Sequence, residues 1–173
     1  ETSESYHAPI EILADIIKEL DIENNERYFK TGVVYKNGKV YEIPLQEVED
    51  FGLKPSHNNT YCNIFTIDVL NILANTLGDE TYRIVSSPVN ANGLRTKFEQ
   101  DPYWEEVNKQ GAIDSAKRGD VVVVSYVHQP HGHVAFVRPD SNENNMYLWN
   151  VGAVNSEKYL WTINDNVKYY RKK

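Results

Sequence analysis

The feature that most limits the fold is a change in apolar spacing between the two halves of the chain. Residues 62–77 carry apolar side chains at three- and four-residue steps, the period of an α-helix. Drawn at 100° per residue, these side chains fill a wide arc and leave a polar wedge of Asp68, Asn71 and Asn75. We therefore predict a mostly buried helix from Cys62 to Leu77 that ends at Gly78.

After Gly111 the apolar residues form short β-branched and aromatic runs, separated by loops rich in Pro, Gly and Asn. These runs predict an antiparallel sheet with strands at residues 121–127, 134–137, 146–151, 159–163 and 167–170. Helices followed by strands are typical of the α+β class.

The N-terminal part predicts one helix and one hairpin. Residues 5–29 have helical spacing, with Pro9 in the first turn and an interruption at Asn24 and Asn25. Residues 33–43 predict a β-hairpin around Asn37-Gly38, with Pro44 ending its second strand.

Two further segments are less regular. Residues 46–60 contain acidic residues, Gly52 and Pro55, and are typical of a surface segment. Residues 92–110 are helical in pattern but contain Asp101-Pro102, so we expect two short helices there.

Length and charge limit the classes of protein that fit. The 173 residues suffice for one domain with a sizeable core, whereas two domains would each be marginal. The 18 basic and 25 acidic residues give a net charge of −7, which excludes nucleic acid and anionic membrane surfaces as favoured partners. The basic residues 171–173 are typical of a solvated tail. The longest apolar run, Val121–Val124, is too short to span a membrane, so we expect a soluble protein.

The chain has one cysteine, which rules out an internal disulfide and any multi-cysteine metal site. Cys62 falls in the apolar arc and in the first turn of the predicted helix, where backbone N–H groups lack partners and the helix dipole is positive. Such a position lowers a thiol pKa and favours a nucleophile. A buried, inert cysteine is the alternative.

A nucleophilic thiol also needs a base, and three histidines surround one predicted turn: His128, His131 and His133. Of these, His133 directly precedes a strand, which would fix its backbone, so we predict that it is the base. Three imidazoles at this spacing also allow zinc, but no fourth ligand is evident, so we expect neither a metal nor another cofactor.

The imidazole requires a partner to fix its orientation. Asn150 lies on the next predicted strand, 17 positions after His133, and antiparallel pairing would put both side chains on one face. Asn155 is the alternative.

These residues resemble a known family. The segment Tyr61-Cys62-Asn63-Ile64-Phe65, the turn Lys117-Arg118-Gly119-Asp120 and the strand Gly132-His133-Val134-Ala135-Phe136-Val137 are similar, in this order, to the CHAP and NlpC/P60 branch of papain-like cysteine amidases. The resemblance covers residues 60–152. It implies a papain-like fold with the cysteine-bearing helix packed on the sheet. Residues 57–173 would then be the core and residues 1–56 an N-terminal extension of one catalytic domain.

The resemblance implies a peptidoglycan hydrolase, with Cys62 as nucleophile, His133 as base and Asn150 as orienting residue. The cleaved bond would be the muramoyl to L-alanine amide or a bond of the stem peptides. Such an enzyme would be secreted, periplasmic or bound to the cell wall. The chain begins at Glu1 without Met, as in a processed or excised chain, so the sequence leaves open both a signal segment and an inhibitor or immunity protein as partner.

One position departs from the family pattern. Many CHAP members have Gln directly before the cysteine, as an oxyanion donor, whereas this chain has Tyr61. Asn59 or the Tyr61 hydroxyl could donate instead. Tyr126 and Trp149, which flank the expected site, are candidate substrate contacts together with Tyr61. Because of this departure and the acidic charge, a non-catalytic module that binds the cell wall or a protein is the second hypothesis. A protease or an effector acting on other substrates is the third.

Overall fold

The computed structural model describes residues 7–50, 57–85, 89–129 and 131–173. Its helices are α1 (Pro9–Leu20), α2 (Leu45–Asp50), α3 (Cys62–Leu77), α4 (Ala91–Gln100) and α5 (Lys109–Arg118), with the 3-10 helices η1 (Glu26–Tyr28) and η2 (Glu80–Tyr82). The strands are β1 (Thr31–Lys36), β2 (Lys39–Pro44), β3 (His57–Asn59), β4 (Trp104–Val107), β5 (Val122–Tyr126), β6 (His133–Val137), β7 (Met146–Asn150), β8 (Ser156–Trp161) and β9 (Val167–Lys172). The fold is therefore α+β.

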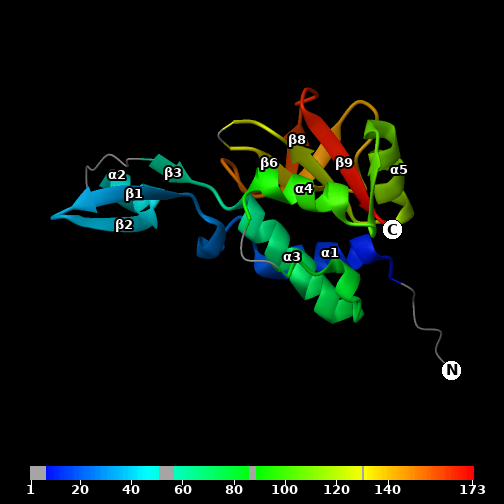
Figure 1. Cartoon of the computed structure of the whole chain (residues 1–173), viewed down its shortest axis with the longest axis horizontal. Coiled ribbons are helices and arrows are strands. Elements are labelled where there is room, and N and C mark those ends of the chain that lie inside the picture. The colour runs from blue at the N-terminus through cyan, green and yellow to red at the C-terminus, as the bar shows by residue number, and fades with distance from the viewer. Residues whose placement is uncertain (1–6, 51–56, 86–88, 130) are drawn as a thin grey trace.

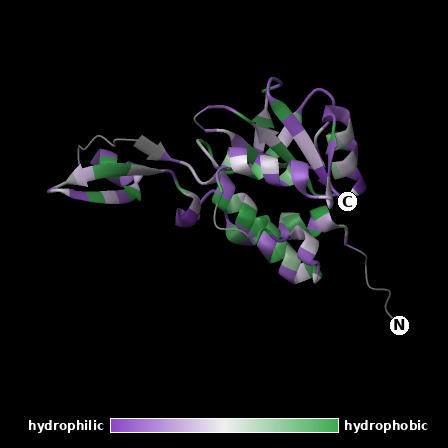
Figure 2. Ribbon diagram, viewed as in Figure 1, coloured by the Kyte–Doolittle hydropathy of each residue, from purple (hydrophilic) through white to green (hydrophobic). Residues whose placement is uncertain are grey.

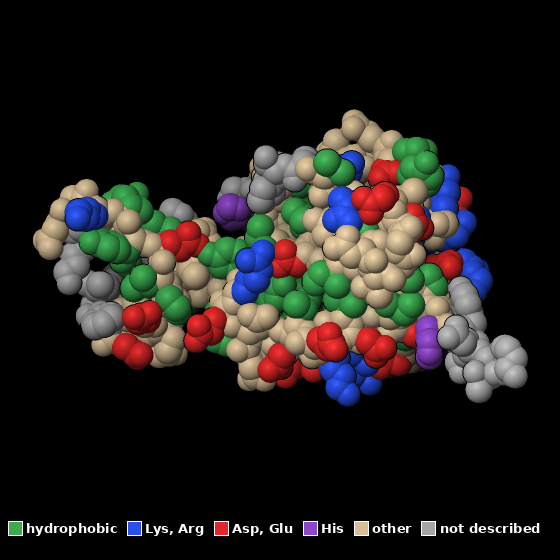
Figure 3. Space-filling model, turned by 90° about the horizontal axis from the view of Figure 1, so that it is seen from below, with side chains coloured by type: hydrophobic (Ala, Val, Ile, Leu, Met, Phe, Trp, Pro, Cys, Tyr) green, Lys and Arg blue, Asp and Glu red, His purple; other side chains and the backbone are tan. Residues whose placement is uncertain are grey.

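Two antiparallel sheets divide the strands between them. The larger sheet has six strands in the order β4-β9-β5-β6-β7-β8, and α3 and α4 pack on it. The smaller sheet, β2-β1-β3, extends to one side as an arm that carries α2 (Figure 1). The arm exposes the apolar side chains of Tyr35, Val40 and Tyr41, and hydrophobic side chains are visible on it in Figure 3.

The core is built around α3, which packs on both α1 and β6. Apolar residues cover most of α1 and α3 (Figure 2). The ring of Phe65 is completely buried, and it meets the rings of Tyr28 and Phe136 edge-on, at centroid distances of 5.6 and 5.8 Å. The helix therefore joins the N-terminal segment to the centre of the sheet.

The predicted bounds of α3 are confirmed, and Gly78 ends it with a positive φ of 64°. The residues of the polar wedge hydrogen-bond to neighbouring segments of the chain. Asp68 accepts hydrogen bonds from the guanidinium of Arg27, at 2.7 Å, and from the hydroxyl of Tyr28, at 2.6 Å. Arg27 and the burial of Tyr28 thus fix η1 against α3.

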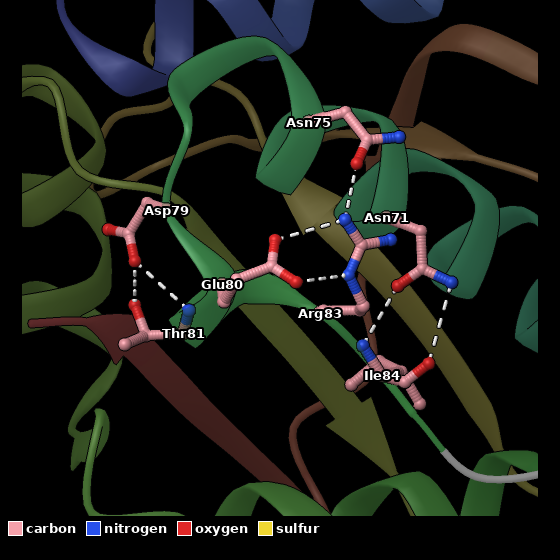
Figure 4. A network of polar contacts seen from close by, with 7 residues as sticks. All are labelled: Asn71, Asn75, Asp79, Glu80, Thr81, Arg83 and Ile84. Carbon is pink, nitrogen blue, oxygen red and sulfur yellow. Dashed lines mark hydrogen bonds and ion pairs between the residues drawn. The ribbon is translucent and has the colours of Figure 1, made fainter.

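The other two wedge residues hold the segment that follows α3 (Figure 4). Asn71 accepts a hydrogen bond from the backbone N–H of Ile84 at 2.8 Å, and Asn75 accepts one from Arg83. Arg83 also forms an ion pair with Glu80 at 2.9 Å. The wedge therefore determines where the chain runs after the helix.

The predicted helix over residues 5–29 is wrong in its length. Residues 5 and 6 lie outside the described residues, Pro9 begins α1 as predicted, and the helix ends at Leu20. Asp21 adopts the left-handed conformation, with φ 48°, and the side-chain amide of Asn25 donates to the carbonyl of Leu20 at 2.8 Å. These local hydrogen bonds compete successfully with helix continuation.

The hairpin is confirmed, with positive φ at both Asn37 and Gly38 and with Pro44 as the last residue of β2. Of the expected surface segment over residues 46–60, residues 46–50 are confirmed as mostly exposed, with Val48 buried, whereas α2 and β3 at its two ends were not predicted; residues 51–56 lie outside the described residues. Strand β3 has only three residues and exists because it pairs with β1 across Thr31 and Asn59. Such long-range pairing leaves no local pattern.

In residues 92–110 the first predicted helix is confirmed as α4, and the second is wrong. Trp104–Val107 is an edge strand, β4, which pairs with β9 from Lys172 to Tyr169. Trp104 is buried, and its ring meets that of Phe98 edge-on, with 4.7 Å between centroids. The helix begins only at Lys109, and we did not predict α5.

The five C-terminal strands are confirmed to within three residues at each end. The prediction of a solvated basic tail is wrong, because residues 171 and 172 belong to β9. Lys172 is buried, with its ammonium 4.4 Å from the ring centroid of Tyr82. None of the described helices has the length and apolar character needed to cross a bilayer.

Replacing Phe65 by Ala should lower the free energy of unfolding by about 3–5 kcal/mol, because it leaves a cavity between η1, α3 and β6. Urea denaturation followed by circular dichroism measures the change. Val85→Ala is the matched control, since Val85 is 82% exposed and its loss should change stability by less than about 0.5 kcal/mol. A loss below about 1 kcal/mol for Phe65→Ala would contradict the central position of this ring.

Candidate functional site

Cys62 is the first residue of α3, and its side chain is 4% exposed. The preceding residue, Tyr61, makes no side-chain cap, whereas α4 and α5 are capped by Asn90 and Asn108. The first hydrogen bond at this end runs from the N–H of Phe65 to the carbonyl of Tyr61. The earlier N–H groups of α3 are therefore left for other partners.

Three backbone N–H groups lie close to the sulfur of Cys62 and favour its thiolate form. They belong to Val134, to Asn63 and to Cys62 itself. The contact with Val134 is informative, because this residue follows His133 in β6. The sulfur at the start of α3 therefore lies at the same end of β6 as the predicted base.

Burial raises the pKa of the Cys62 thiol above its ordinary value, and the three N–H groups oppose this effect without overcoming it. The expectation of a lowered thiol pKa is therefore not met in the free protein. The helix terminus does act in the expected direction, but removal of the thiol from water has the larger effect. At neutral pH the resting form is the thiol.

His133 and Asn150 form a direct hydrogen bond, with 2.6 Å between the Nε2 and Oδ1 atoms. The side-chain amide of Asn150 donates to the carbonyl of Val154 at 2.7 Å, so its Oδ1 must face the imidazole. Nε2 of the neutral ring therefore carries the proton, and Nδ1 carries the lone pair. The predicted orienting contact fixes the tautomer.

The strand register explains this contact. Phe136 pairs with Trp149, and continuation of the register puts Ala135 opposite Asn150 and His133 opposite Gly152. His133 and Asn150 are thus diagonal neighbours on one face of the sheet. Phe136, which packs against α3, lies on the other face. The sulfur lies near the N–H of Val134, and the imidazole belongs to the preceding residue of β6.

Two residues that the sequence analysis did not assign to the site complete the surroundings of the imidazole. The ring of Trp161 stacks on His133 with 5.9 Å between centroids. On Gly152, a Cβ atom would lie only 3.0 Å from Cε1 and 3.4 Å from Nδ1 of His133. A glycine directly opposite a strand histidine is a usable signal, whereas the position of Trp161 depends on an irregular register between β7 and β8.

Burial lowers the pKa of His133 below its ordinary value, and the hydrogen bond to Asn150 acts in the opposite direction. The imidazole is therefore neutral near pH 7. A neutral thiol and a neutral imidazole form the resting pair, rather than an ion pair.

Asn155 makes different contacts from those of Asn150. Its amide donates to the carbonyl of Tyr28 at 2.7 Å, and its Oδ1 accepts the N–H of Gly152 at 2.9 Å. Asn155 thus joins the loop after β7 to η1. Of the two candidates, only Asn150 contacts the imidazole.

The other candidate residues are engaged elsewhere. The hydroxyl of Tyr61 contacts Glu42 and Thr31, and the side-chain amide of Asn59 donates to Glu42 at 3.2 Å. Trp149 is buried beneath the guanidinium of Arg138, 5.1 Å from the ring centroid, on the face opposite Asn150.

Tyr126 stacks on His128, with 5.7 Å between ring centroids, and meets Trp161 edge-on. His128 and His131 are both exposed. Among the residues that the structure describes, no three His, Cys, Asp or Glu side chains converge as metal ligands would.

A pocket of about 310 Å³ opens beside Cys62. Its walls come from the chain before α3, the start of α3, the start of α4 and the loop before β6: Asn59, Thr60, Cys62, Asn63, Asn90, Ala91, Asn92, His131 and Gly132. At Gly132 a Cβ atom would lie 2.4 Å from the carbonyl oxygen of Tyr126, so only glycine fits at this position of the loop. The pocket gives a small polar molecule access to the cysteine.

The two shifted groups predict the pH dependence of stability. His133 has a lowered pKa in the fold, so its contribution is present above about pH 6.5 and is lost as the pH falls below that value. Cys62 has a raised pKa, so its contribution is present below about pH 9 and is lost above it. Urea midpoints measured across this range should be highest between the two values. His133→Gln should reduce the loss of stability at acid pH, whereas His128→Gln should leave it unchanged. Equal losses of stability in the two variants would contradict the assignment of this effect to His133.

Comparison with known proteins adds no relative. No protein-family model matches the chain, and no curated protein matches it either. The functional interpretation therefore depends on the side chains around Cys62 and His133.

Proposed function

We propose that this protein is a cysteine-dependent amide hydrolase of the papain-like type that acts on peptidoglycan. The observation that carries the proposal is the hydrogen bond from His133 Nε2 to Asn150, together with the contact of the Cys62 sulfur with the N–H of Val134. The proposal is further supported by the pocket that opens beside Cys62 and by the position of His133 directly before Val134 in β6.

The reaction begins with proton transfer from the thiol. Because both groups rest in their neutral forms, Nδ1 of His133 takes the proton as the sulfur attacks the amide carbon. A carbon–sulfur bond forms, and the electron pair of the carbonyl bond moves to oxygen. The hydrogen bond to Asn150 keeps the imidazole oriented and stabilises the imidazolium that results.

The negative oxygen requires donors, and the uncapped first turn of α3 supplies backbone N–H groups at Cys62 and Asn63. This arrangement needs no donor from the side chains of Tyr61 or Asn59. Both side chains instead bind Glu42, which fixes the segment that leads into α3.

The imidazolium then protonates the leaving amine, the carbon–nitrogen bond breaks and a thioester remains. Neutral His133 next removes a proton from water, which attacks the thioester. The carbon–sulfur bond breaks, the acid is released, and the thiol recovers its proton from His133. The cycle uses no redox step.

Peptidoglycan is proposed as substrate because the order of the cysteine helix, the histidine strand and the asparagine strand is that of the CHAP and NlpC/P60 enzymes. The bond is the muramoyl to L-alanine amide or a stem-peptide amide. The α+β arrangement, with α3 on an antiparallel sheet, supports a papain-like core.

Cys62→Ala should abolish hydrolysis of purified cell-wall sacculi, with a decrease of at least about 10³-fold, because no other group can form the thioester. The loss of turbidity measures the rate, and mass spectrometry of the released fragments identifies the bond. His133→Ala should be similarly inactive, while His128→Ala, the matched control, should retain activity.

A wild-type protein that clears no sacculi and cleaves no stem-peptide amide would favour the second candidate, a non-catalytic binding module. The neutral thiol and imidazole are the observation that favours this candidate. A Cys62→Ala variant that remains folded and fully active would exclude Cys62 as the nucleophile.

Asn150→Ala should lower kcat at least about tenfold, because the imidazole loses the acceptor that fixes its tautomer. Asn150→Asp should recover part of this loss and should move the acid limb of the kcat/KM profile to higher pH, since a carboxylate raises the pKa of His133. Asn155→Ala should lower stability without moving that limb. An unchanged pH profile in Asn150→Asp would contradict the positioning role.

A further inference from the structure

The pocket beside Cys62 is walled by polar groups without charge. Asparagine is its dominant residue type: Asn59, Asn63, Asn90 and Asn92 all line it. Among the described residues of the wall there is no Asp, Glu, Lys or Arg, and His131 is the only titratable side chain besides the thiol. A charged group entering this pocket would lose water without gaining a counter-charge.

Each of three asparagines is fixed by one hydrogen bond. This bond determines whether the oxygen or the NH₂ group of the side-chain amide remains available to a ligand. Asn63 donates its amide to the carbonyl of Val89 at 2.9 Å, so its Oδ1 remains as an acceptor. Asn59 donates to Glu42, so its Oδ1 also remains.

Asn90 has the opposite orientation. Its Oδ1 accepts the N–H of Gly93 at 2.7 Å as the cap of α4, and its NH₂ group remains as a donor. Within the described part of the chain, no further partner contacts these three remaining groups. Asn92 donates its amide to the carbonyl of His128 at 3.2 Å, and its buried Oδ1 has no partner among the described residues, so the asparagines of the pocket combine three free acceptors with one free donor.

This combination discriminates between ligand groups. A carboxylate offers only acceptors, which match the NH₂ group of Asn90 and repel the oxygens of Asn59 and Asn63. An ammonium offers only donors, which leave that NH₂ group unmatched. A carboxamide offers both an NH₂ donor and a carbonyl acceptor, and it carries no charge.

The electrostatic surroundings of the pocket also favour an uncharged group over a carboxylate. The carboxylate of Glu42 accepts a hydrogen bond from Asn59 at 3.2 Å, and the whole chain has a net charge of −7. Both disfavour an anion near the thiol. The volume of about 310 Å³ is at the lower end for ligand pockets, so it suits a small group rather than a long segment.

We infer that the pocket beside Cys62 binds an uncharged carboxamide group of the substrate and excludes the corresponding carboxylate. The inference rests on the proposed function for the reacting bond, and it names the substrate class as peptides in which the residue next to that bond is amidated. Asn59, Asn63 and Asn90 are its specificity-determining residues.

Iodoacetamide and iodoacetate test this directly, because they differ only in carboxamide against carboxylate. In both reactions the sulfur forms a bond to the CH₂ carbon, iodide leaves with the electron pair, and the thiol proton passes to solvent. The two rate constants for Cys62 are measured by mass spectrometry at one pH. Their ratio is then divided by the ratio for a short cysteine peptide. Thiolate fraction cancels in this ratio.

We expect the ratio of the iodoacetamide to the iodoacetate rate constant to be at least about tenfold higher for Cys62 than for the peptide. The reason is that an unpaired charge is strongly disfavoured in a neutral pocket. Asn90→Asp should increase the preference further. It replaces only the free NH₂ group with a negative oxygen, and it keeps the cap on Gly93, since Asp and Asn cap helices about equally well.

Asn108→Asp is the matched control. Asn108 caps α5 through the N–H of Gly111 at 2.7 Å, the same geometry as Asn90, but it does not line the pocket. This variant makes the same change in cap and in net charge, and it should leave the preference at the wild-type value.

A wild-type ratio equal to that of the peptide would overturn the inference. So would equal ratios in Asn90→Asp and Asn108→Asp, or a thiol that reacts with neither reagent until the protein unfolds. These readouts need no hydrolysis. A strong carboxamide preference in a protein that cleaves no amide would leave the pocket assignment standing and refute the proposed hydrolase.

Discussion

The contact between the start of α3 and the start of β6 is the constraint on which the site depends. Phe65, one turn after Cys62, fixes α3 against Phe136, and the N–H of Val134 lies close to the sulfur. The N–H of the second residue of a strand can lie beside a helix terminus only if the two elements are held in one register. The buried aromatic cluster provides that register, and the loop before β6 passes the pocket only because residue 132 is glycine.

The regular parts of the fold could be predicted because their signals are local. The bounds of α3, the Asn37-Gly38 turn and the C-terminal strands all follow from periodicity and turn chemistry. The failures share a cause in long-range pairing. β3 exists through β1, and β4 exists through β9, about 65 positions away. The buried Lys172 similarly depends on Tyr82, which no local pattern near the C-terminus reveals.

The candidate site could likewise be predicted only in part from the sequence. Cys62, His133 and Asn150 could be selected because a helix start and two adjacent strands determine their approximate positions. The protonation state of the Cys62 thiol could not be predicted, because burial changes its pKa more strongly than the helix terminus does. Trp161 and the asparagine-lined pocket come from segments that meet only in the folded chain. The engagement of Tyr61 by Glu42 also required the position of the arm.

The absence of a side-chain cap on α3 has an energetic consequence. A cap typically contributes about 1 kcal/mol to a helix, and α4 and α5 both have one. At α3 the residue in that position is a tyrosine whose hydroxyl is directed to the arm. The chain thus gives up local helix stability at the one terminus where a capping oxygen would compete with a substrate for the same N–H groups, and tertiary packing has to compensate for it.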